Sequence, residues 1–113
     1  MNTIVIGLDG GNWPLIDQWI EEGELPNIKE LKEDSASGIS KSELPPVTCP
    51  NWRCYASGKN PGKLGVFWWE NFDFENEEME IHSSDDFESA ELWDYLNESG
   101  YETGIVNLPM SYP

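Results

Sequence analysis

Asp9 is the first residue whose type and position could support chemistry. It directly follows residues 3–8, an apolar and largely β-branched run that predicts a buried parallel strand. Open α/β sheets bind ligands and metals at the carboxyl ends of such strands, where a carboxylate can hold a divalent cation. Two glycines follow Asp9, so the alternative is that Asp9 only shapes a turn.

Thr48 is the second such residue. It follows the extended Pro45-Pro46-Val47 segment and precedes Pro50, which fits the first turn of a helix. The hydroxyl would then lie near a helix N-terminus, where N–H groups and the helix dipole favour an anion such as phosphate. A nearby metal could lower the pKa of the hydroxyl and make it a nucleophile. On spacing alone, a plain helix cap is the more frequent role for a threonine in this place.

The elements that would position these two residues form an α/β pattern. Residues 3–8 and 103–108 predict buried strands, and residues 38–40 could form another. A strand, then helices, then a strand is typical of parallel strands flanked by helices. Two clearly predicted strands are few for such a sheet, because most sheets have about four or more. We therefore expect residues 1–113 to be one N-terminal, incomplete portion of a single longer domain.

Helical periodicity and capping residues predict helices between these strands. Asn12 is a good N-cap for the first helix, and Pro26 is well placed at the start of the second. The stretch from 59 to 63 predicts a turn-rich loop, and the acidic, aromatic stretch from 70 to 80 predicts a surface excursion. The helices are expected at residues 12–22, 26–33, 51–57 and 89–99.

Composition restricts the classes of function. The chain has 113 residues and a formal net charge of −16, which excludes binding of nucleic-acid backbones by a basic surface as its main role. No apolar run approaches the roughly 20 residues that span a bilayer, and no signal-peptide pattern opens the chain. Cys49 and Cys54 would lie far apart around a helix, which disfavours a disulfide between them. We expect reduced thiols, a cytoplasmic location and no membrane segment in this portion.

The histidine and several tryptophans can also be assigned to positions at the surface or in the core. His82 lies in an acidic, serine-rich stretch and is predicted at the surface. Trp19 and Trp93 fall on the apolar faces of predicted helices, so we expect both in the core. Trp68-Trp69 could line a substrate pocket in a complete enzyme, or remain exposed in a chain of this length.

Several motifs follow one another in order along the chain. They are Asp9-Gly10-Gly11, the Pro-Pro-Val-Thr-Cys-Pro-Asn-Trp run at 45–52, the Ser-Gly-Lys-Asn-Pro-Gly-Lys-Leu-Gly-Val-Phe run at 57–67, Leu-Trp-Asp-Tyr-Leu at 92–96, and residues 100–113. Together they resemble the type I phosphodiesterase/nucleotide pyrophosphatase family, a branch of the alkaline phosphatase superfamily. The resemblance covers residues 4–113 and is weakest between 70 and 80.

The resemblance implies a fold and a chemistry. It implies the N-terminal part of an alkaline-phosphatase-like α/β fold and a hydrolase of small phosphate esters that uses two divalent metal ions, in this family zinc. Asp9 matches a metal ligand, and Thr48 matches the metal-bound catalytic nucleophile that carries a phosphoryl intermediate. The backbone N–H of Cys49 would help to bind the phosphoryl oxygens. The remaining Asp and His ligands of the family lie beyond Pro113, so the isolated chain should be inactive.

Differences from related families narrow this interpretation. Sulfatases need Cys or Ser at the nucleophile position and Arg four residues later, where this chain has Thr48 and Trp52. Nucleotide-cleaving members place an Asn where this chain has Trp69, so Trp69 would contact the substrate and a nucleotide preference is in doubt. Leu64 replaces a histidine that many relatives carry, outside the expected reaction centre.

Two other functions fit the same chain. It could be a non-catalytic acidic interaction module derived from this family, which should fold alone as a monomer. It could also be a phosphotransferase like the phosphoglycerate mutases, which move phosphate between hydroxyls instead of to water. The sequence leaves the oligomeric state and the exact substrate open.

Overall fold

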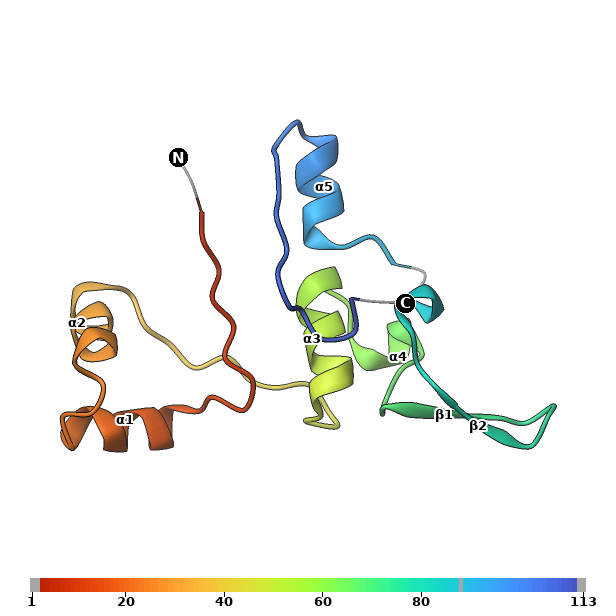
Figure 1. The fold of residues 1–113 in the computed structure, drawn as a ribbon, viewed down its shortest axis with the longest axis horizontal. Helices are drawn as coiled ribbons and strands as arrows, with labels where there is room; N and C mark the ends of the chain where they lie inside the picture. Colours follow the sequence, from red (N-terminus) through yellow and green to blue (C-terminus); the bar gives the residue numbers. More distant parts are fainter. Residues whose placement is uncertain (1–2, 88, 112–113) are drawn as a thin grey trace. The chain divides into compact units, whose positions relative to one another are not determined.

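The computed structural model describes residues 3–87 and 89–111 of the chain (Figure 1). Within this part, five α-helices and a two-stranded antiparallel sheet give the protein its mixed α/β content. The chain divides into two compact units, Met1–Lys41 and Ser42–Pro113. Each unit is described by itself below.

The first unit contains two helices where the sequence predicts them. Helix α1 (Trp13–Glu21) begins after Asn12, whose side chain accepts a hydrogen bond from the backbone N–H of Leu15 at 3.1 Å. Helix α2 (Pro26–Asp34) begins with a proline at its first position, where the missing N–H costs nothing. Both helix predictions are confirmed, because cap and proline signals act within a few residues of the helix end.

Polar contacts hold α1 against α2. The ammonium group of Lys32 pairs with Asp17 at 2.5 Å and lies 4.6 Å from the centre of the Trp13 ring. The indole N–H of Trp13 donates to the carbonyl of Gly38 at 3.0 Å. All described residues of this unit are at least partly exposed. Trp19 is 40% exposed, so its predicted place in a core is wrong.

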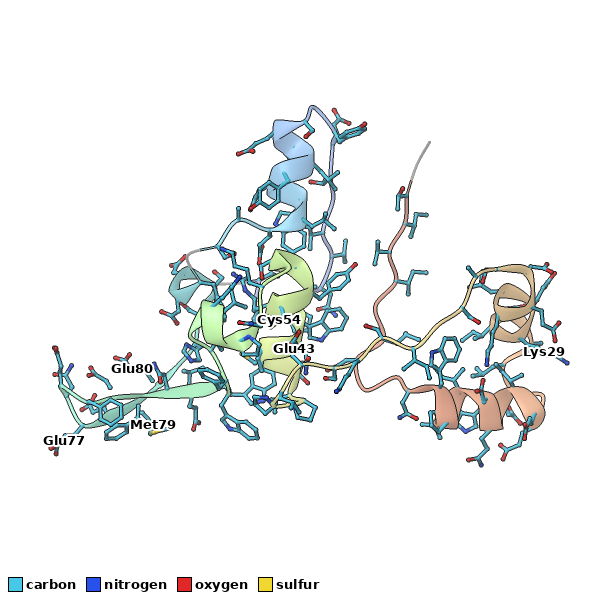
Figure 2. The ribbon with its side chains drawn as sticks, turned by 180° about the vertical axis from the view of Figure 1, so that it is seen from behind. Lys29, Glu43, Cys54, Glu77, Met79 and Glu80 are labelled. Atoms are coloured by element: carbon cyan, nitrogen blue, oxygen red, sulfur yellow. The ribbon has the colours of Figure 1, made fainter. Side chains whose placement is uncertain are left out.

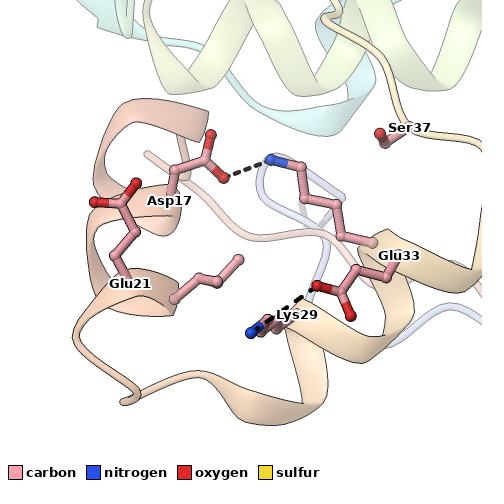
Figure 3. Close-up of a pocket in the computed structure, with 7 residues that line it drawn as sticks. Asp17, Glu21, Lys29, Glu33 and Ser37 are labelled. Carbon is pink, nitrogen blue, oxygen red and sulfur yellow. Dashed lines mark hydrogen bonds and ion pairs between the residues drawn. The ribbon is translucent and has the colours of Figure 1, made fainter.

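Figure 3 shows an open hollow between α1 and α2. Both of its lysines pair with carboxylates, Lys32 with Asp17 and Lys29 with Glu33 at 4.0 Å. The charges are therefore largely compensated within the hollow, and none of the predicted site residues lines it. The lining residues are Asp17, Ile20, Glu21, Lys29, Lys32, Glu33 and Ser37.

The second unit is built around helix α3 (Thr48–Ser57), which ends at Gly58 in the left-handed conformation. The predicted helix is confirmed, but it begins three residues earlier than the pattern suggests. The predicted loop after it contains the short helix α4 (Pro61–Leu64). The Asn60 side chain makes this turn helical by accepting a hydrogen bond from the N–H of Lys63 at 3.0 Å.

The predicted surface excursion is confirmed, and it takes the form of an exposed β-hairpin. Strands β1 (Glu70–Asp73) and β2 (Glu78–Ile81) pair antiparallel, with Phe72 opposite Met79. Asp73 shapes the turn by accepting hydrogen bonds from the N–H groups of Glu75 and Asn76 at 2.7 and 3.3 Å. The labelled Glu77, Met79 and Glu80 show the tip and second strand of this hairpin in Figure 2.

The last helix, α5 (Leu92–Glu98), confirms the prediction of a helix in this region, but it begins three residues later than residue 89 and contains no buried residue. Trp93 is partly buried there, while Leu92 is 46% exposed. A 3-10 turn, Ser84–Asp86, precedes α5. The prediction that His82 lies at the surface is wrong: its side chain is 8% exposed and its ring packs beside Phe87, with ring centres 6.0 Å apart.

The predicted parallel strands are not formed in the part of the chain that the structure describes. Residues 3–8, 38–40 and 103–108 belong to no sheet, and Ile4, Ile6 and Val106 are 84%, 81% and 91% exposed. A buried parallel strand needs a hydrogen-bonded neighbour and cover on both faces. These segments have the composition of buried strands, but they have no hydrogen-bonded neighbour strand among the described residues. The expectation of parallel strands flanked by helices is therefore wrong for this part of the chain.

Candidate active site

Thr48 is the first residue of α3. The residue before it, Val47, is the N-cap and is extended, with φ −115° and ψ 143°. Thr48 itself is half-buried. The predicted location of its hydroxyl at a helix N-terminus is thus confirmed, and the first-turn N–H groups and the helix dipole give this position a partial positive charge.

The small core of the second unit lies directly beside Thr48. Cys49 is fully buried and packs in one cluster with Val66 and Phe87, which are 2% and 6% exposed, and Met110 packs against that cluster. The residue that follows the threonine is therefore fixed by tertiary packing. This limits the movement of the Thr48 backbone from its C-terminal side.

The chain before Thr48 is bound back onto α3 by Asn51. The Asn51 carboxamide oxygen accepts from the backbone N–H of Glu43 and from the hydroxyl of Ser42, each at 3.0 Å. Its NH₂ group donates to the carbonyl of Val47 at 2.9 Å. Figure 2 shows Glu43 in this segment close to Cys54 of α3, and the charge of Glu43 contributes to raising the pKa of that thiol.

A buried ion pair connects α3 to the start of α5. The guanidinium of Arg53 lies 2.7 Å from a carboxylate oxygen of Glu91, and the two side chains are 5% and 11% exposed. Arg53 also donates to the carbonyl of Met110 at 3.2 Å and lies 4.1 Å from the centre of the Phe87 ring. Among the described residues no hydrogen-bond donor is aligned with the Oε1 atom of Glu91, so the contact is an ion pair with poor hydrogen-bond geometry.

Burial governs the titration of this cluster. Burial raises the pKa of the Glu91 carboxyl, an effect that the Arg53 charge opposes and the nearby Asp94 charge reinforces. Burial likewise raises the pKa of the Cys49 thiol, although the charge of Arg53 lowers it in part. Cys54 is also a free thiol with a pKa raised by burial. Both cysteines are therefore protonated at neutral pH and are poor nucleophiles.

Asp9 lies in a turn of the first unit. Gly10 has φ 69°, and the N–H of Gly11 donates to the carbonyl of Leu8 at 3.2 Å. A Cβ atom at Gly11 would lie 3.1 Å from that same carbonyl oxygen, so a larger residue there would crowd the turn. The turn and the metal-ligand interpretations of Asp9 both remain compatible with this geometry.

Trp69 directly precedes β1 and is 39% exposed. Its carbonyl accepts a hydrogen bond from the N–H of His82 at 3.0 Å, which closes the open end of the hairpin. Thr48 and Cys49 are consecutive residues of the second unit, and Trp69 belongs to the same unit. Asp9 belongs to the first unit.

The described residues do not complete a metal centre. Among residues 3–87 and 89–111, no group of three or more His, Cys, Asp or Glu side chains is close enough to hold a metal ion. Asp9 and Thr48 would provide at most two ligands, and a two-metal centre needs more. The residues present therefore do not by themselves fit the two-metal site that the sequence resemblance implies.

Sequence reasoning missed three residues that organise the second unit: Asn51, Arg53 and Glu91. Asn51 reads as an ordinary polar residue of a first helical turn, and its long-range role depends on the folded loop. One signal was available for Arg53, because it is the sole arginine of the chain and lies on a helix beside Cys54. An isolated cation among apolar neighbours indicates a buried partner.

Comparison with known families places the chain among phosphate-ester hydrolases. A sequence profile described as type I phosphodiesterase / nucleotide pyrophosphatase matches residues 3–113. The chain therefore belongs to the type I phosphodiesterase/nucleotide pyrophosphatase family, as its motifs indicated. This family is generally metal-dependent and acts on small molecules that contain phosphate esters.

The other comparisons add no closer relative. No curated protein and no solved structure gave a significant match. Within the described residues, none of the helices has the length and apolar character required to cross a membrane.

Proposed function

We propose that this protein is the N-terminal part of a hydrolase that cleaves phosphodiester or pyrophosphate bonds through Thr48. The observation that carries the proposal is the place of Thr48 at the first position of α3, in the Pro-Pro-Val-Thr-Cys-Pro-Asn run of a member of this family. At this position the first-turn N–H groups and the dipole of α3 favour the binding of an anion such as a phosphoryl group.

The proposed reaction uses two displacements at phosphorus. The hydroxyl oxygen of Thr48 attacks the phosphorus, and one ester oxygen leaves with the bonding electron pair and takes up the threonine proton. The phosphoryl group, which still carries its second substituent, is then bonded to the threonine oxygen. Water then attacks the same phosphorus, and the threonine oxygen leaves and regains a proton. The N–H of Cys49 and the positive end of the α3 dipole would stabilise the equatorial oxygens during both displacements.

The proposed reaction includes metal ions because the family is generally metal-dependent. Two divalent ions, zinc in the first instance, would supply Lewis acidity at the phosphoryl group. Asp9 and the Thr48 oxygen would be ligands, and further carboxylates and imidazoles would have to complete the centre. We accordingly expect the 113-residue chain to be inactive by itself.

Trp69 would contact the substrate. Trp69 is 39% exposed and follows Trp68 in the chain, which is 53% exposed, so both residues are accessible in the unit that holds Thr48. An aromatic side chain at this position would pack against an apolar or planar leaving group instead of binding phosphate oxygens as an amide does. We also propose a cytoplasmic location, since both cysteines are buried free thiols.

Replacement of the nucleophile tests the proposal. In the complete gene product, Thr48→Ala should lower the turnover of bis(4-nitrophenyl) phosphate with added zinc by about 1,000-fold or more. Thr103→Ala is a matched control, because Thr103 is an exposed threonine whose hydroxyl donates to Asn97. Acid quenching followed by mass spectrometry should find a 4-nitrophenyl phosphoryl group on residue 48 in the wild-type protein and in Thr103→Ala.

Other outcomes would change the assignment. Normal turnover by Thr48→Ala would remove Thr48 from the mechanism. Transfer of phosphate to an added alcohol in preference to water would instead indicate a phosphotransferase. A complete gene product without zinc binding and without turnover would favour a non-catalytic acidic module.

A further inference from the structure

The segment that leads into Thr48 is poor in its own backbone hydrogen bonds. Pro45 and Pro46 lack an N–H and cannot donate, so two consecutive residues before Val47 offer only acceptors. One local bond remains, from the N–H of Val47 to the carbonyl of Pro45 at 2.9 Å. The segment thus needs bonds from elsewhere to hold one conformation.

Asn51 supplies those bonds at both ends of the segment. Its oxygen accepts from Ser42 and from the N–H of Glu43, and its NH₂ donates to the carbonyl of Val47, all at 2.9–3.0 Å. The same Val47 carbonyl accepts the helical N–H of Asn51 at 3.1 Å. One half-buried side chain on the first turn of α3 therefore bridges the start of the segment and the residue directly before Thr48.

The chemistry of this bridge requires a carboxamide. The oxygen must accept two hydrogen bonds while the nitrogen donates one, and an asparagine side chain does both at once. An aspartate in its place keeps the acceptor bonds but sets a carboxylate oxygen against the Val47 carbonyl. An alanine loses all three bonds and leaves the Glu43 N–H and the Val47 carbonyl without these partners.

We infer that Asn51 is a positioning residue for Thr48: its carboxamide fixes residues 42–47 so that the threonine hydroxyl is presented in one orientation. The inference rests on the proposed role of Thr48 as nucleophile. Cys49 is fixed in the core on the other side of the threonine. The Asn51 side chain constrains the chain on the N-terminal side, and its loss should let Val47 and the Thr48 backbone shift.

The effect of Asn51 substitutions on turnover tests this inference. In the complete gene product, Asn51→Ala should lower kcat by about 10- to 100-fold, because displacement of a nucleophile by about 1 Å has effects of this size. KM should change less than about threefold, since the lost interaction acts in the transition state and not in binding. Asn51→Asp should recover part of kcat, because it keeps the bonds to Ser42 and Glu43.

Asn60→Ala is the matched control. Asn60 is another asparagine of the second unit, and its side chain caps α4 through a 3.0 Å bond from the N–H of Lys63. The kcat of Asn60→Ala should stay within about twofold of the wild type, because this substitution removes a side-chain hydrogen bond of α4 and leaves the bonds of Asn51 intact. Hydrogen exchange at the Glu43 amide should accelerate in Asn51→Ala and stay slow in Asn51→Asp and Asn60→Ala.

The outcomes separate this inference from the proposed function. If Thr48→Ala abolishes turnover while Asn51→Ala and Asn60→Ala have equal kcat values, the positioning role is refuted and the nucleophile stands. If Thr48→Ala retains turnover, the proposed function fails, and the positioning role fails with it. A fall in kcat limited to Asn51→Ala, with partial recovery in Asn51→Asp, supports the inference.

Discussion

Each of the two units contains an ion pair between side chains, and the two pairs differ strongly in solvent exposure. In Met1–Lys41, Lys32 and Asp17 pair with side chains that are 33% and 44% exposed, and no described residue is buried. In Ser42–Pro113, Arg53 and Glu91 pair with side chains that are 5% and 11% exposed, beside a cluster of apolar residues. An exposed pair is screened by water and contributes little, whereas a buried pair is costly to break.

This difference bears on the two predicted site residues. Thr48 starts a helix whose next residue is fully buried, so its conformation is maintained by packing within its own unit. Asp9 lies in an exposed turn that precedes an exposed helix. Short helices of this length are marginal in isolation. We therefore expect the second unit to keep its local structure under conditions in which the first unit frays.

The largest expected effect comes from breaking the buried ion pair. Arg53→Ala should destabilise the second unit by about 3–5 kcal/mol, because it leaves the Glu91 carboxylate buried without its cation. It also removes the hydrogen bond to Met110 and the contact with Phe87. Hydrogen exchange at the amides of α3, resolved by mass spectrometry, would measure the loss.

An exposed pair and a double substitution serve as controls. Lys32→Ala should cost about 0–1 kcal/mol in the first unit, since its ion pair is largely solvated. Replacing both partners, as Arg53→Met with Glu91→Leu, should be far less harmful than Arg53→Ala, because no unpaired charge remains. Equal losses from Lys32→Ala and Arg53→Ala would remove the distinction between the two units.

Four of the five helices in the described residues could be predicted from sequence because their signals are local, whereas α4 lies where a loop was predicted. Asn12 and Pro26 mark helix starts, and Gly58 stops α3, all within a turn of the end concerned. The strands could not be predicted in the same way, because pairing depends on a partner elsewhere in the chain. Residues 3–8 have a strand composition without a partner, whereas the acidic residues 70–81 form a hairpin through their turn and register.

At the candidate site, too, local features could be predicted from sequence and contacts between distant residues could not. The type and spacing of residues around Thr48 were sufficient to predict a helix N-terminus there. Asn51 could not be identified as its brace, because the bonds to Ser42 and Glu43 arise only once the intervening segment has folded back. Burial of His82 was also missed, since Phe87 covers it by a tertiary contact.

A smaller effect is expected at the cap of α1, and it tests how independent the first unit is. Asn12→Ala removes the 3.1 Å bond from the Leu15 N–H and should cost this helix about 1 kcal/mol. With no buried core to compensate, the amides of α1 should exchange several-fold faster. The matched substitution Asn60→Ala in the second unit removes a similar bond, and it should leave α1 exchange unchanged.

The smallest expected effect is the pH dependence of the buried pair. Burial raises the pKa of Glu91 above its ordinary value of 4.5, despite the opposing charge of Arg53. A carboxyl with a raised pKa in the folded state favours folding in its protonated form. Its contribution is therefore fully present below the ordinary value and declines as the pH rises through the folded-state pKa.

Glu91→Gln isolates this contribution, because glutamine keeps the shape of the side chain and does not titrate. The stability of the second unit relative to that of Glu91→Gln should fall as the pH rises from the ordinary carboxyl value of 4.5 toward neutrality, because the folded-state pKa of Glu91 is raised by burial. Urea unfolding of both proteins across this range, followed by tryptophan fluorescence, measures the difference. If the stability of the wild type relative to Glu91→Gln instead increased as the pH rises, the attraction of Arg53 would outweigh the cost of burial. The buried pair would then stabilise the second unit through its charge and not only through its fit.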